Sequence, residues 1–181
     1  MKVSAKLIAI LAVVTLLAGS SFAAGTTDIG LKGIGARLGY VDLEDWDGTF
    51  NFGAVANLGT FTKYLAWDAS FEYWTSSESA YGFDVAISDL ALRSGVLYEF
   101  IHDSFRPHAG GGLGLHMVSA EVATIYGKAS EDDSKFGIYL QGGVETDLSA
   151  RWKGAADIRF DFVDNADQTH IMFTAIYLLG K

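Results

Sequence analysis

Apolar and polar residues alternate with a period of two along most of the chain, as in "FRPHAGGGLGLHM" at residues 105–117. In that stretch the odd positions are apolar or small, and the even positions hold glycine, Arg106 and two histidines. Such alternation is typical of β-strands, because successive side chains point to opposite faces. It predicts strands at residues 31–41, 49–59, 64–75, 84–100, 105–119, 135–145, 151–162 and 169–179.

One row of alternate positions in each predicted strand is free of Asp, Glu, Lys and Arg, as at Ile34, Ala36, Leu38 and Tyr40. The opposite row holds the charges: Arg37, Asp68, Glu72, Asp89, Arg93, Glu99, Arg106, Lys135, Glu145, Lys153, Asp157, Arg159 and Asp161. A lipid-facing Arg or Lys near the bilayer centre costs about 2–4 kcal/mol. We therefore expect the apolar row to face hydrocarbon and the charged row to face the inside of a barrel.

Three other features indicate a transmembrane barrel. The predicted connections alternate between short turns and longer loops, the longest at residues 120–134, as in barrels with short periplasmic turns. Aromatic residues gather at both ends of the apolar rows, where girdles mark the membrane interfaces. Glycines on the charged row leave room for long side chains in a narrow interior. The predicted fold is all-β, a closed antiparallel eight-stranded transmembrane up-and-down β-barrel.

The first residues are typical of an export signal. Lys2 and Lys6 precede an apolar run at residues 7–17, and Ser21 and Ala23 are small residues suited to signal-peptidase cleavage. The run is too short for a membrane-spanning helix, which needs about 20 residues. We predict a signal peptide at residues 1–23, removed on export, and a single barrel domain at residues 24–181.

The amino-acid composition excludes several kinds of ligand and binding site. The net charge of −9 argues against nucleic acid, because phosphate binding needs a basic surface. The sequence contains no cysteine, so neither disulfides nor thiolate metal sites are available. We predict no cofactor.

The segments "GIGARLGYVD", "RPHAGGGLGL", "GIYLQGGVETDLSARW" and "FTAIYLL" together resemble the small eight-stranded outer-membrane barrels of the OmpA-like, OmpX-like and OmpW-like type. These are also described as outer-membrane β-barrel domain or porin-family proteins. The resemblance covers the whole predicted mature chain. It implies a location in the bacterial outer membrane, with lipid and lipopolysaccharide around the barrel and the barrel-assembly machinery as a partner during biogenesis.

Two acidic stretches are candidate cation sites. One holds Asp42, Glu44, Asp45 and Asp47 before Gly48, and the other holds Glu131, Asp132 and Asp133. Carboxylates at these spacings suit a hard cation, such as a divalent ion that bridges lipopolysaccharide, but the distal bidentate Glu of a calcium loop is missing. We interpret both stretches as solvated surface loops and predict no metal site.

The histidines are candidate catalytic groups, because some barrels of this size modify lipid A with a Ser-His-Glu arrangement on the lipid-facing surface. Here His116 and Ser119 differ in parity, so they point to opposite faces. His108 and His116 fall on the inward row, and His170 has no serine nearby in the sequence. We predict no catalytic residue and no enzymatic activity.

The interior charges are the remaining candidate site: Arg37, Asp68, Glu72, Asp89, Arg93, Glu99, Arg106, Asp157 and Arg159. Because both signs occur along the strands and the lumen of eight strands is narrow, we expect a salt-bridged plug. The predicted function is that of an integral outer-membrane protein with a structural or surface-interaction role. Two alternatives are a small porin-like channel for small solutes and a soluble lipocalin-like binder with the apolar row turned inward.

Overall fold

The computed structural model describes residues 27–43, 46–80, 83–100, 104–124, 127–164 and 166–180. The predicted signal peptide, together with Glu44 and Asp45, lies outside the described residues. Within the described part, no helix is long and apolar enough to cross a membrane. The elements are β1 (Asp28–Leu43), β2 (Trp46–Thr62), β3 (Leu65–Ala80), β4 (Phe83–Glu99), β5 (Phe105–Thr124), β6 (Gly127–Asp147), β7 (Trp152–Val163) and β8 (Gln168–Leu178).

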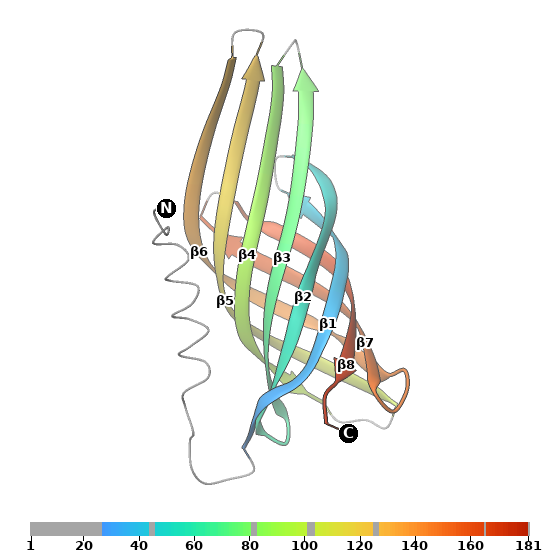
Figure 1. Cartoon of the computed structure of the whole chain (residues 1–181). Coiled ribbons are helices and arrows are strands. Elements are labelled where there is room, and N and C mark those ends of the chain that lie inside the picture. The colour runs from blue at the N-terminus through green and yellow to red at the C-terminus, as the bar shows by residue number, and fades with distance from the viewer. Residues whose placement is uncertain are drawn as a thin grey trace.

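The strands pair in chain order, each antiparallel to the next, and β1 pairs with β8 to close the ring (Figure 1). Leu38, for example, lies opposite Phe52 of β2 and Phe173 of β8. The start of β1, the end of β8 and the β2–β3, β4–β5 and β6–β7 connections lie at one end, here called the terminal end. The other four connections lie at the opposite, distal end.

The side chains alternate in the predicted sense. Leu38, Leu140 and Ile158 are 64%, 57% and 49% exposed on the outer surface, whereas Arg159 is fully buried inside. The other inward arginines of the middle of the barrel, Arg37 and Arg93, are buried as well. The prediction of apolar residues outside and charges inside is therefore confirmed. The lipocalin-like alternative is wrong, because the apolar row lines the outer surface instead of an internal ligand cavity.

The predicted loop at residues 120–134 is wrong. β5 continues to Thr124 and β6 begins at Gly127, with an unbroken register between them. β3 and β4 extend in the same way, so that β3, β4, β5 and β6 rise beyond the other strands (Figure 1). The pairing of β3 with β2 ends at Trp74, and the pairing of β6 with β7 begins at Gly137. Among the described residues, these extensions therefore form strand pairs only with one another, and β3 is linked to β2 there by hydrogen bonds to Asp47 and Thr49. We call residues 75–80, 83–88, 118–124 and 127–134 the projecting sheet.

Gly95 illustrates how the narrow interior is filled. A Cβ atom at this position would collide with the hydroxyl oxygen of Tyr139 and lie 2.6 Å from the carbonyl oxygen of Gly111. The ring of Tyr139 is buried, and the guanidinium carbon of Arg159 lies 5.8 Å from the ring centroid. The bare backbone at Gly95 thus makes room for the ring that packs against Arg159.

Gly95→Ala is expected to lower the free energy of unfolding by about 1–3 kcal/mol, because the added methyl group displaces Tyr139. The measurement is urea unfolding in lipid vesicles. Gly142→Ala is the matched control, since a Cβ atom there meets only the carbonyl oxygen of His108, at 3.7 Å. Equal losses for the two variants would contradict this account of Gly95.

Candidate functional site

A buried ion cluster crosses the middle of the barrel, with Glu72 of β3 at its centre. Arg159 of β7 donates two hydrogen bonds to the Glu72 carboxylate, at 2.8 and 2.6 Å. Arg37 of β1 donates a third at 2.9 Å, and Arg93 of β4 forms an ion pair at 3.3 Å. Three guanidinium groups from three strands therefore share one carboxylate, and strand alternation directs all of them inward.

Asp161 of β7 is the second anion of this cluster. Arg93 binds it with two nitrogens, at 3.2 and 2.9 Å, and the Nε of Arg159 donates to it at 3.1 Å. Asp161 was recognised in the sequence as an inward charge but was not placed among the network residues. With Glu72, it surrounds the buried guanidinium groups with acceptors, which offsets the cost of removing those charges from water.

Uncharged residues extend the cluster toward the distal end. The Nε2 atom of His170 lies 2.9 Å from the Asp161 carboxylate and 3.0 Å from the side-chain oxygen Oε1 of Gln168. The Nδ1 atom of His170 lies 3.2 Å from the side-chain nitrogen Nδ2 of Asn51. Two acceptors face Nε2 and one donor faces Nδ1, which fits a neutral imidazole protonated on Nε2. Gln168 also donates to Asp89 at 3.1 Å. Sequence reasoning missed these polar residues, because it selected the network by charge.

Further ion pairs lie toward the two ends of the barrel interior, and the distal one is joined to the central cluster through Gln168. Toward the distal end, Nδ1 of His116 lies 2.6 Å from Asp89. At the terminal end, Arg106 binds Glu145 at 3.1 Å, and Lys153 binds the same carboxylate at 2.7 Å. Arg106 also pairs with Asp147 at 2.6 Å, where the Asp147 side chain is half exposed. Each of these ion pairs joins two neighbouring strands, so it lies along the inner wall of the barrel and does not cross the lumen.

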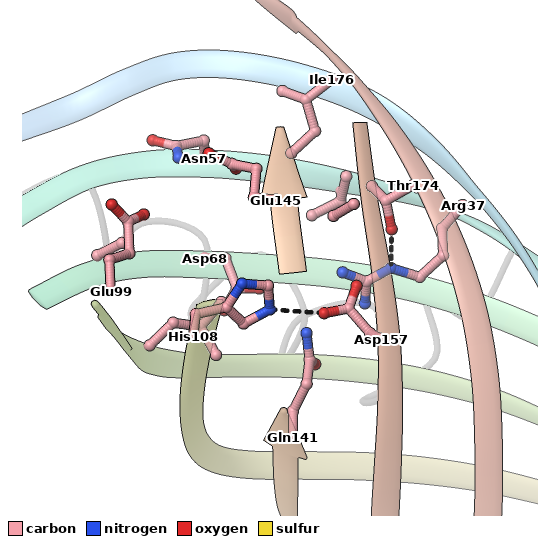
Figure 2. A pocket seen from close by; sticks show the side chains of 14 residues that line it. Arg37, Asn57, Asp68, Glu99, His108, Gln141, Glu145, Asp157, Thr174 and Ile176 are labelled. Atoms are coloured by element: carbon pink, nitrogen blue, oxygen red, sulfur yellow. Dashed lines mark hydrogen bonds and ion pairs between the residues drawn. The ribbon is translucent and has the colours of Figure 1, made fainter. Parts of the chain in front are cut away.

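A cavity of about 40 Å³ lies on the terminal side of the central cluster, and Figure 2 shows the side chains that line it. Its wall includes His108, whose Nε2 lies 2.6 Å from Asp157. Asp68 and Glu99 also line it, and within the described part of the chain neither forms an ion pair. About 10–15 Å³ is needed to hold one water molecule, so this cavity has room for only a few. The structure thus places these two predicted residues beside the cavity instead of in the cluster.

The other sequence candidates lie apart from the central cluster. His116 is buried inside, while the hydroxyl of Ser119 donates to Asp132 of the neighbouring strand, so the two residues face opposite sides as predicted. The interpretation of the acidic stretches as loops is wrong, because Asp42 belongs to β1, Asp47 to β2, and Glu131, Asp132 and Asp133 to β6. Among the described residues, no group of three or more His, Asp or Glu side chains is arranged to hold a metal ion.

The ring of antiparallel strands with an apolar outer surface and an ionic interior has known counterparts. A family model described as "Outer membrane protein beta-barrel domain" matches residues 9–177. The chain belongs to this family. The protein is accordingly a β-barrel of the bacterial outer membrane. No curated protein matches the chain.

Solved structures show the same fold at low sequence identity. Neisserial surface protein A is 13% identical, with 81% of this chain and 96% of that chain covered and a TM-score of 0.65. Ail of Yersinia pestis, in complex with the heparin analogue sucrose octasulfate, is 18% identical, with 82% and 97% covered and a TM-score of 0.57. The N-terminal β-barrel domain of Pseudomonas aeruginosa OprF is 8% identical, with 83% and 99% covered and a TM-score of 0.54.

Proposed function

We propose that this family member is a non-catalytic outer-membrane protein whose barrel is plugged and whose role is structural or surface interaction. The observation that supports it is the ion cluster around Glu72. In a ring of eight, β3 and β7 are four strands apart in either direction. The two hydrogen bonds from Arg159 to Glu72 therefore join opposite walls of the barrel.

The energetics favour a closed interior. Removing one partner of a buried ion pair destabilises a protein by about 3–5 kcal/mol, because the other charge is left buried without a counter-charge. Opening a path through this cluster requires several such contacts to break together, at Arg37, Arg93 and Arg159. The cavity beside the cluster has room for only a few water molecules, which is too little for a solute path.

We place the distal end outside the cell, because β3, β4, β5 and β6 extend beyond the other strands at that end, and the larger protein segments of outer-membrane barrels stand on the extracellular side. The projecting sheet then stands at the cell surface. Its acidic residues, among them Glu131, Asp132 and Asp133, argue against the sulfated type of ligand bound in the Ail complex. The proposal also includes lipid and lipopolysaccharide around the barrel, the barrel-assembly machinery as the partner in biogenesis, and removal of residues 1–23.

Planar-bilayer recordings test the plug. We expect the wild-type protein to give no steady single-channel steps, and Arg159→Ala to give small steps, because the variant loses the contacts that cross the lumen. Asp132→Asn, which lies on the outward face of β6, serves as the control and is expected to stay silent. Steady steps in the wild type that Arg93→Ala alters would instead support the porin-like alternative.

A further inference from the structure

The alternation of apolar and polar residues reverses where the strands leave the barrel wall. Along the outward row of β3, Phe71 and Tyr73 are followed by Thr75 and Ser77. The neighbouring strands change in the same way, with Ser88 beyond Leu90 on β4, Ser119 beyond Met117 on β5, and Ser134 and Asp132 beyond Phe136 on β6. Since a lipid-facing surface stays apolar, the projecting sheet stands outside the hydrocarbon.

On β4 and β5, the two middle strands of the projecting sheet, the inward row changes in the opposite direction, from charged to apolar. Val85 and Ile87 of β4 share parity with the buried Asp89, and the inward row of β5 beyond His116 holds Val118, Ala120 and Val122. Val85 pairs with Val122 and Ile87 pairs with Ala120, so the side chains lie side by side. We call Val85, Ile87, Val118, Ala120 and Val122 the apolar strip.

The apolar strip remains accessible in the structure. Val122 is 37% exposed, and the other four residues are of intermediate burial. The strip consists of three successive rows of side chains. Because alternate residues of a strand are about 6.7 Å apart, the three rows span about 13 Å along the strands. An apolar patch that faces water and is bordered by polar groups is typical of an interaction surface.

Carboxylates border the strip on both sides. Glu78 on β3 is paired with Val85, while on β6 Glu131 is paired with Ala120 and Asp133 with Val118. All three share the inward parity of the strip. The nearest inward cation on these edges, Lys135, donates to the backbone oxygen of Asp164 at the barrel rim. The strip is therefore apolar in the middle and negative along its edges.

We propose that the apolar strip binds a cationic amphipathic peptide segment, with apolar side chains on the strip and Lys or Arg side chains at Glu78, Glu131 and Asp133. This inference deepens the surface-interaction role proposed above and rests on it. Charge complementarity selects the occupant. A second copy would bring the same carboxylates together, and an anionic lipid would meet them with its headgroup, so both are disfavoured.

Binding can be measured with the protein in nanodiscs of zwitterionic phosphatidylcholine. The probe is a fluorescent synthetic amphipathic helix of leucine and lysine, with empty nanodiscs as the reference. We expect saturable binding above that reference. The double variant Val85→Thr/Val122→Thr keeps β-branched side chains and is expected to weaken binding about tenfold, because the apolar contact is lost.

The charges are tested on the same sheet. Glu131→Gln/Asp133→Asn is expected to weaken binding and to reduce its dependence on salt. Asp132→Asn removes a neighbouring charge from the opposite face of β6 and is expected to leave binding unchanged. A Leu/Glu peptide with the same apolar face is expected to bind no more than it binds to empty nanodiscs.

Three outcomes would overturn the inference. The first is that the Leu/Glu peptide binds as tightly as the Leu/Lys peptide, and the second is that neither double variant changes the affinity for the Leu/Lys peptide. The third is that sedimentation shows dimers of the protein without peptide, and that these dimers are lost in Val85→Thr/Val122→Thr. Migration of unboiled samples on gels shows that each variant keeps its barrel. If the peptide fails to bind while the wild-type protein gives no channel steps, the peptide inference fails and the proposal of a plugged barrel is retained. If the wild-type protein gives channel steps while the peptide still binds, the proposal of a plugged barrel fails and the peptide inference is retained.

Discussion

Glu72→Ala is expected to lower the free energy of unfolding by about 3–5 kcal/mol. The substitution removes the carboxylate that Arg37, Arg93 and Arg159 share, and it leaves their charges buried among fewer acceptors. Asp161 continues to bind Arg93 and Arg159, but among the described residues Arg37 is left with its hydrogen bond to Thr174, at 3.0 Å. The measurement is urea unfolding in phosphatidylcholine vesicles, followed by tryptophan fluorescence.

Two further variants make this result specific. Glu72→Gln keeps the volume and one acceptor oxygen, so its loss is expected to be smaller than that of Glu72→Ala and to remain measurable if the alanine variant does not fold. Asp147→Asn weakens an ion pair whose Asp147 side chain is 51% exposed, and it is expected to cost less than about 1 kcal/mol. A loss for Glu72→Ala as small as that for Asp147→Asn would show that the central cluster does not stabilise the barrel.

Leu140→Arg is expected to destabilise the barrel in the membrane by about 2–4 kcal/mol, because it places a charge in the middle of the lipid-facing row of β6. Leu140 is exposed on the outer surface, between Ile138 and Gly142 of the same row. The same urea titration in vesicles measures the effect.

Leu148→Arg provides the comparison for Leu140→Arg. Leu148 is also exposed, but it lies in the β6–β7 turn at the terminal end, where the cost of a charge falls to about 0–1 kcal/mol. Leu140→Ala separates the charge from the loss of the leucine side chain. If Leu140→Arg and Leu148→Arg cost the same, Leu140 is not in contact with hydrocarbon.

The eight strands and the direction of their side chains could be predicted because lipid imposes a strict rule on one face. The distal ends of the strands could not, because the rule changes outside the membrane. Beyond Tyr73 and Leu90 the outward row becomes polar, so a search for one constant pattern ends there. Residues 127–134 also include Gly, Ala, Lys, Glu and two Asp, which have low strand propensity, yet pairing with the neighbouring strand holds them extended.

The interior site could be predicted in part. Charge and parity were enough to select Arg37, Glu72, Arg93 and Arg159, which the structure brings together. Which charges meet depends on the curvature that sets β3 opposite β7, and no local pattern encodes it. His170 and Gln168 lie on the inward row of the last strand, so parity was the available signal, but they were passed over because they carry no formal charge.

With the orientation proposed above, the projecting sheet has a consequence for recognition at the cell surface. Its hydrogen-bonded pairing continues to Thr124 and Gly127, so the described part of the projecting sheet is regular sheet along its length. A long flexible loop loses conformational entropy when a ligand fixes it, whereas a paired sheet has already lost that freedom during folding. Recognition on this surface would therefore depend on a preorganised template, and its affinity would respond to the shape of single side chains more than to loop length.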